Sequence, residues 1–212
     1  MRQSISTTNK IDNKLTQFSV IQMISRECLR EYDGNLQKLI AGCLPQNRKD
    51  QKMLYKALYG FAMKICIRYA GNRVEAVEIM NKGFLKVFAK LKKHNIDHLF
   101  ISWVGLIMVT ACINYYSSSL KLSLYEDQEV TEDISNIDLP EQKLNYDELL
   151  RVIQQLPNAD RIVFNLFAIE GFSHGEIAAY LSISTSTSKS ILCNARAKLK
   201  IILNSCRLAG NS

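Results

Sequence analysis

Turn-forming residues are scarce in this sequence, which has 3 prolines and 9 glycines among its 212 residues. Leucine, isoleucine, lysine and alanine are abundant by comparison. Because proline and glycine interrupt helices, this composition predicts an all-α protein. The length is enough for one or two domains with hydrophobic cores of their own.

Paired cysteines are also lacking. The chain has six cysteines, none of them in a Cys-x-x-Cys pair: Cys28, Cys43, Cys66, Cys112, Cys193 and Cys206. Three of them (43, 66 and 112) lie within apolar patterns of helical spacing, so we expect free thiols in a reducing compartment rather than disulfides or zinc ligands. His94 and His98 are four residues apart, but no glutamate or cysteine joins them at ligand spacing, and we expect no metal.

No stretch of the sequence looks like a membrane or export segment. The polar start MRQSISTTNK lacks the apolar core of a signal peptide. The longest apolar run, residues 99–113, is interrupted by Ser102 and Thr110 and is too short to cross a bilayer comfortably. We therefore expect a soluble, cytoplasmic protein without membrane insertion.

Catalytic patterns are missing as well. The sequence has no Ser-His-Asp grouping, no paired carboxylates in a cleft pattern, no phosphate-binding loop and no metal cluster. Ser173 and His174 are better explained as a helix cap and its neighbour than as a nucleophile and base. The prediction is a protein that is not an enzyme and uses no cofactor.

What the sequence does have is positive charge and a helical pair near its C-terminus. The formal net charge of +7 favours a polyanionic partner. Residues 173–203 read as two helices, in which Ser173 and Glu176 have the spacing of a capping box. The segment 182–184 forms the corner, and Ser184 or Thr185 caps the second helix.

The exposed start of that second helix is rich in hydroxyl groups. Short hydroxyl side chains and a lysine at a helix N-terminus suit a base edge or a phosphate. The pattern is typical of a helix-turn-helix whose second helix enters the major groove, with these candidate DNA-binding residues: Thr185, Ser186, Thr187, Ser188, Lys189, Ser190 and Arg196. An ordinary helical hairpin is the alternative, since Ser182 stands where many such corners have glycine.

Amphipathic helical patterns begin near Leu36 and continue to Tyr116. In the pattern that runs from Val74 to Leu91, Val74 is expected to face inward. Residues 117–145 are rich in aspartate and glutamate and lose apolar periodicity. We predict an N-terminal extension (1–35), a helical domain (36–116), a flexible acidic linker (117–145) and a helix-turn-helix domain (146–206).

Two parts of the chain carry a resemblance to a known family. The first part contains LIAGCLPQNRKDQKMLYKAL, RYAGNRVEAVEIMNKGFLKVFAKL and WVGLIMVTACINYY, and the second contains VIQQLPNADRIVFNLFAIEGFSHGEIAAYLSISTSTSKSILCNARAKL. In their order and their residue sequences these segments resemble bacterial RNA polymerase sigma factors of the extracytoplasmic-function group. The likeness covers roughly residues 36–203.

The resemblance implies a region 2-like domain and a region 4-like domain with different partners. The first would bind the RNA polymerase core through Glu75, Glu78, Asn81 and Lys82. Its melting residues would be His94, His98, Trp103 and Tyr116, although by default Trp103 would be a core residue, and helical phase favours a buried Tyr115. The linker would thread toward the polymerase active-site cleft. The second domain would read the upstream promoter element, and an anti-sigma factor is left open as a further partner.

The sequence also departs from the family pattern. Asn81 and Lys82 stand at the usual Gln-Glu positions, Gly105 and Leu106 stand at a usual basic pair, and Asn194 replaces an arginine. The leading hypothesis is a sigma factor that directs RNA polymerase to promoters. One alternative is a DNA-binding transcriptional regulator whose first domain no longer engages polymerase. Another is a protein-interaction module with a merely structural hairpin.

Overall fold

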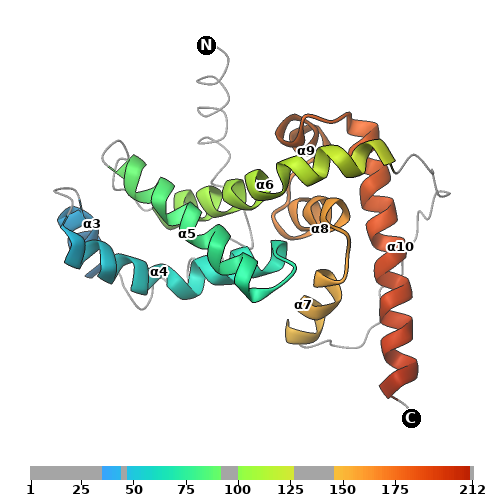
Figure 1. Cartoon of the computed structure of the whole chain (residues 1–212), viewed down its shortest axis with the longest axis horizontal. Helices are drawn as coiled ribbons and strands as arrows, with labels where there is room; N and C mark the ends of the chain where they lie inside the picture. Colours follow the sequence, from blue (N-terminus) through green and yellow to red (C-terminus); the bar gives the residue numbers. More distant parts are fainter. Residues whose placement is uncertain (1–34, 44–46, 92–99, 127–145, 211–212) are drawn as a thin grey trace. The chain divides into compact units, whose positions relative to one another are not determined.

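The computed structural model describes residues 35–43, 47–91, 100–126 and 146–210. Within these ranges the regular elements are all helical, which confirms the predicted all-α fold (Figure 1). In chain order they are α3 (Asn35–Cys43), α4 (Arg48–Tyr69), α5 (Arg73–Lys90), α6 (Phe100–Glu126), α7 (Tyr146–Gln154), α8 (Asn158–Phe164), the π-helix η3 (Asn165–Ile169), α9 (His174–Leu181) and α10 (Thr185–Gly210).

The chain packs as two compact units. The first comprises Met1–Cys66 and Val77–Ala111, and the second comprises Ile67–Ala76 and Cys112–Ser212. The second unit therefore combines the C-terminal helices with a short stretch from the end of α4 to the start of α5. These are units of packing, and the domain boundaries read from the sequence stay predictions.

The first unit buries side chains from three long helices. Its largest fully buried residues include Leu54 and Ile65 on α4, Ile79 on α5, and Met108 on α6. From Phe100 to Ile113 most residues of α6 are buried and the others are partly buried, as the apolar run predicts. Despite that composition, the described part of the chain has no helix long and apolar enough to cross a membrane.

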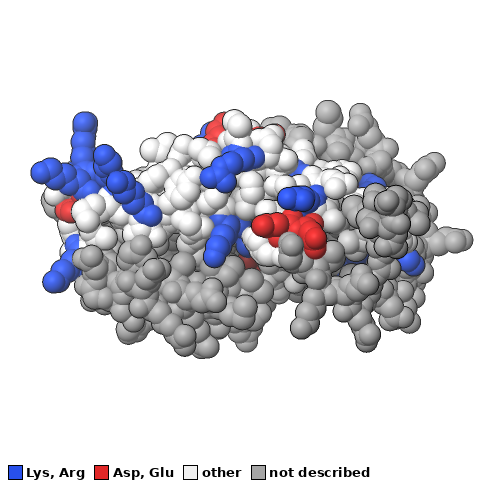
Figure 2. All heavy atoms as spheres, turned by 90° about the horizontal axis from the view of Figure 1, so that it is seen from below, with Lys and Arg blue, Asp and Glu red and all other residues white. Residues whose placement is uncertain are grey.

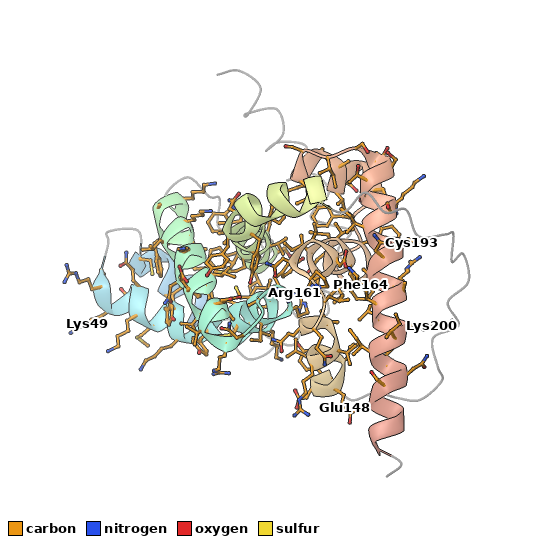
Figure 3. The ribbon with its side chains drawn as sticks, turned by 45° about the vertical axis from the view of Figure 1, so that its right-hand side comes forward. Lys49, Glu148, Arg161, Phe164, Cys193 and Lys200 are labelled. Atoms are coloured by element: carbon orange, nitrogen blue, oxygen red, sulfur yellow. The ribbon has the colours of Figure 1, made fainter. Side chains whose placement is uncertain are left out.

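The second unit is built around α10. A core of Val152, Leu156, Ala195 and Leu199 joins α7 to α10, with Phe164 packed against it. Figure 3 shows Phe164 on α8 beside α10. On α10, Leu192 and Leu199 are buried, while Ile202 and Leu203 are partly buried against the same core.

Helix α6 is longer than expected. The sequence places its end at Tyr116 and a flexible linker from residue 117, but the helix continues to Glu126. The added segment SSSLKLSLYE contains no proline or glycine, so nothing in it breaks a helix that is already formed. The first ten residues of the expected linker are therefore helical.

The described cysteines carry no disulfide. Cys43, Cys66 and Cys112 are buried free thiols and Cys193 is partly buried, while the side chains of Cys28 and Cys206 lie outside the described part. Burial, helped by the nearby Asp50 carboxylate, raises the pKa of Cys43 to about 11. Such a thiol stays protonated near neutral pH and is a poor nucleophile.

Candidate nucleic-acid interface

The corner before the exposed helix is fixed at both ends of α9. The Ser173 hydroxyl accepts a hydrogen bond from the Glu176 backbone N–H at 3.4 Å, and the Glu176 carboxylate accepts one from the Ser173 N–H at 2.9 Å. This confirms the predicted capping box. At the other end Ser182 takes up a left-handed conformation with φ 57°, which glycine adopts more easily. The serine thus performs the turn for which many such corners use glycine.

Ser184 caps the start of α10. Its hydroxyl accepts a hydrogen bond from the Thr187 backbone N–H at 2.9 Å. The same oxygen lies 2.7 Å from the Ser186 hydroxyl and 2.8 Å from the Thr187 hydroxyl. Of the two caps that the sequence leaves open, Ser184 is the one that forms this bond.

The first turns of α10 present most of the predicted DNA-binding residues to solvent. Thr185, Ser186, Lys189 and Arg196 are exposed. Two more, Thr187 and Ser190, are partly exposed. The structure contradicts a direct contact from Ser188, whose side chain is 0% exposed because it faces α9. Its place on the inner face follows from helical phase, since Ile191, Leu192 and Ala195 face the same way.

His174 holds the start of α10 against α9. Its Nδ1 atom lies 3.0 Å from the Ser188 hydroxyl oxygen, and its ring stacks on Phe167 with centroids 4.6 Å apart. The Arg196 guanidinium lies 5.8 Å from the centre of that Phe167 ring. Partial burial lowers the pKa of His174, and Lys189 and Arg196 lower it further. The sequence identifies His174 only as the neighbour of a helix cap. Its contact with Ser188 could not be predicted, because the two residues are fourteen positions apart and lie on either side of the corner.

A second contact fixes the middle of α10. The Lys198 ammonium donates to the Asp160 carboxylate on α8 at 2.7 Å, and Asp160 is mostly buried. Lys198, which counts as free positive charge in the sequence, is therefore committed to a partner. Lys200 remains exposed, and Figure 3 shows it on α10 some way beyond Cys193.

The predicted polymerase-binding residues lie along α5. Glu78, Asn81 and Lys82 are exposed, with a 2.6 Å ion pair between Glu78 and Lys82. The Tyr55 hydroxyl donates to the Asn81 side-chain oxygen at 3.0 Å. One turn further, Leu85 is 71% exposed. Leu85 has no role in the sequence-based prediction, although its seven-residue spacing from Glu78 places both on one helical face.

Glu75 and Tyr116, which were predicted to have separate roles, are bonded to each other. The Tyr116 hydroxyl donates to a Glu75 carboxylate oxygen at 2.6 Å, and the Gly71 backbone N–H donates to the same oxygen at 3.0 Å. The bond from Tyr116 is the largest of several causes that lower the pKa of Glu75. Burial, reinforced by Glu75, raises the pKa of Tyr116. In this arrangement the Tyr116 side chain is buried, while Glu75 stays partly exposed.

Other expectations for the first part of the chain meet mixed outcomes. Tyr116 is the buried tyrosine and Tyr115 is partly exposed, so the expectation from helical phase was wrong. Val74, expected inward, is 80% exposed because it lies at the very start of α5. Trp103 is partly buried, with its ring 5.7 Å from that of Phe100.

His94 and His98 lie outside the described residues. Among those that are described, no three His, Cys, Asp or Glu side chains are grouped as metal ligands would be.

The chain is similar in sequence to known proteins. The family described as Sigma-70, region 4 matches residues 146–199. The RNA polymerase sigma-H factor of Pseudomonas aeruginosa is 25% identical over an alignment of 144 residues, and the match covers 62% of this chain and 75% of that protein. The ECF RNA polymerase sigma-E factor of Escherichia coli K12 is 27% identical over an alignment of 134 residues, and the match covers 56% of this chain and 69% of that protein.

One solved structure that resembles the chain is a sigma factor, RpoE, in complex with the anti-sigma factor NepR from Bartonella quintana. The two sequences are 19% identical, the match covers 74% of this chain and 98% of that chain, and the TM-score is 0.45.

Proposed function

We propose, from the premise that this chain belongs to the extracytoplasmic-function group of the sigma-70 family, that the exposed start of α10 reads the upstream promoter element. As a member of that family the chain is a sigma factor, which binds RNA polymerase and directs it to promoters. Its part in transcription is regulatory. We further propose that it has no catalytic activity of its own and that it acts in the cytoplasm, where it meets polymerase and DNA.

The observation that carries this proposal is the presentation of α10. Two capped corners and the His174 contact fix the backbone, while Thr185, Ser186 and Lys189 extend into solvent. A recognition helix in the major groove contacts base edges with residues near its N-terminus. Of the two threonines, Thr185 is the better candidate for a base contact, since the Thr187 hydroxyl already lies against Ser184.

The face of α5 suits the proposed contact with polymerase. Glu78, Asn81 and Lys82 form a polar stripe that continues into the exposed Leu85. An apolar side chain beside polar groups is a usual anchor at a protein interface. Glu75 is partly exposed and can join these contacts. Tyr116 is buried, so a contact with melted DNA would require its hydrogen bond to Glu75 to open. Roles for Trp103, His94 and His98 in melting, and an anti-sigma partner, are proposed on family resemblance alone.

The decisive experiment is transcription in vitro with purified core polymerase and a library of genomic promoter fragments. We expect transcripts from a defined subset of fragments, and only when the chain is added. A chain that binds fragments but yields no transcript and does not copurify with core polymerase would instead be a DNA-binding regulator. The uncharged residues of α6 at Gly105 and Leu106 make this second outcome a specific alternative.

Lys189→Ala tests the reading helix on a promoter selected in that experiment. If Lys189 contacts a phosphate, the variant should bind more weakly and the slope of log affinity against log salt should fall by about one. Lys90→Ala removes an exposed lysine from the last turn of α5 and is the matched control. Equal affinities for Lys189→Ala and the unmodified chain would show that the reading helix is misassigned.

A further inference from the structure

The start of α4 carries a concentration of positive charge that neither the reading helix nor the polymerase-binding face uses. Within residues 48–56 there are four basic residues, Arg48, Lys49, Lys52 and Lys56, against a single acid, Asp50. All four basic side chains are exposed. Figure 2 shows a cluster of Lys and Arg side chains at the left of the view, and Figure 3 shows Lys49 extending away from the ribbon. We call these four residues the α4 basic row.

The α4 basic row has no internal neutralising partner in the described part of the chain. None of its four side chains takes part in an ion pair there, whereas Lys82, Lys198 and Arg68 each have a carboxylate partner. The one acid, Asp50, accepts a hydrogen bond from the Asn47 side-chain amide at 2.8 Å. Like charges four residues apart on a helix repel each other, so the row is better suited to a bound polyanion than to the isolated chain.

The spacing of the row matches an extended ligand. Arg48, Lys52 and Lys56 are four residues apart and so share one face of α4, at intervals of about 6 Å along the helix axis. Three charges in line over about 12 Å fit a chain of anionic groups better than one small anion. A strand of duplex DNA presents a phosphate about every 3.4 Å along its axis.

The surroundings favour duplex DNA over single strands or a protein. Single-stranded nucleic acid needs exposed aromatic rings for stacking. The Tyr55 ring on this helix is already packed 4.6 Å from Phe84, centroid to centroid, and its hydroxyl is bonded to Asn81. Lysine is depleted at protein interfaces, which need an apolar centre, and the only large apolar residue exposed beside the row, among the described residues, is Met53.

We propose that the α4 basic row binds the phosphate backbone of duplex promoter DNA without reading its sequence, as a contact separate from the reading helix. This inference rests on the proposed function, which brings the whole chain onto DNA. Backbone contacts position a protein and carry no sequence information. The row should therefore add affinity and salt dependence while leaving promoter choice unchanged.

The test compares two triple variants of the full chain. Arg48→Gln with Lys52→Gln and Lys56→Gln removes the three charges in line from the row, and Lys64→Gln with Lys86→Gln and Lys90→Gln removes the same charge from elsewhere on α4 and α5. Each variant lowers the formal net charge from +7 to +4, since 7 − 3 = 4. Affinity is measured across a range of salt concentrations on a selected promoter duplex and on a duplex of scrambled sequence, with circular dichroism as the check on folding.

We expect the row variant to bind both duplexes more weakly by the same factor, with a salt slope reduced by about 0.9 for each phosphate that the row no longer neutralises. The control variant should change the slope much less. Equal slopes for the two variants would overturn the inference, and so would unchanged DNA binding together with failure to copurify with polymerase. Promoter selection and polymerase binding are measured separately on the unmodified chain. A failure of this inference therefore leaves the proposed sigma-factor function intact.

Discussion

At the scale of single residues, Ser182 and His174 have structural roles that their residue types do not predict. Ser182 adopts the left-handed conformation that favours glycine, with φ 57°, and so completes the corner. His174 reaches across that corner to the Ser188 hydroxyl and to the Phe167 ring. The reading helix therefore depends on residues that do not themselves face DNA.

His174 should make the stability of the chain depend on pH. Burial and two nearby cations lower its pKa in the folded state below the ordinary value of 6.5. The folded state then favours neutral imidazole, so this contribution is fully present above about pH 6.5 and is lost as pH falls through the lowered pKa.

The measurement is the thermal unfolding midpoint at a series of pH values between neutral and mildly acidic. The chain has 3 histidines, so the comparison must be made with His174→Phe, which keeps a ring against Phe167 and cannot titrate. The variant should lose less stability than the unmodified chain on acidification. Parallel curves for the two proteins would show that His174 does not contribute.

At the scale of elements, close helix packing depends on one glycine. A methyl group added to Gly83 on α5 would meet the Met108 sulfur and the Ala111 side chain of α6. Met108 is itself 0% exposed, so it has little room to move. Gly60 on α4 is the opposite case, because a methyl group there meets nothing within 4 Å.

The two glycines should respond in opposite directions to alanine. Gly60→Ala should stabilise the chain by about 0.4–1 kcal/mol, because alanine has less freedom to lose when the helix forms. Gly83→Ala should destabilise it by about 1–3 kcal/mol, which is the usual cost of overpacking a core. Chemical denaturation followed by circular dichroism gives both values, and a gain in stability at Gly83 would mean that α5 and α6 separate easily.

At the scale of the whole molecule, a buried ion pair joins residues far apart in the sequence. Arg68, at the end of α4, donates to Glu170 at 2.7 Å, and both side chains are almost fully buried. Burial raises the pKa of Glu170, which the Arg68 guanidinium opposes. Arg161, also buried, donates to the Tyr69 carbonyl at 2.8 Å. The second unit thus holds residues 67–76 to its C-terminal helices with charged groups.

Replacing one partner of this pair should be costly. Glu170→Gln leaves the Arg68 charge buried without its counter-ion and should destabilise the chain by about 3–5 kcal/mol. Glu78→Gln breaks the exposed pair with Lys82 and should cost about 0–1 kcal/mol. Urea denaturation of both variants checks the difference. Similar small losses would mean that residues 67–76 leave the second unit without penalty.

Local patterns predicted much of the fold and of the reading helix. The capping box at Ser173, the long helices and the inward residues of α10 follow from spacing alone. The helical phase of Ile191, Leu192 and Ala195 could also have placed Ser188 inward. The sequence could not show that Lys198 pairs with Asp160, because that contact depends on how neighbouring helices pack. It also could not show the bond between Glu75 and Tyr116, which are 41 residues apart.

The extra length of α6 has a consequence for promoter architecture. With α6 ending at Glu126 and α7 beginning at Tyr146, only residues 127–145 are left to tether the two, which is 145 − 126 = 19 residues. Drawn out fully, they reach about 65 Å, or about 19 base pairs of duplex. A helix that stopped at Tyr116 would leave 145 − 116 = 29 residues and a reach of about 100 Å. If the chain binds two DNA elements at once, as proposed, the segment between Glu126 and Tyr146 can add at most about 65 Å to their separation.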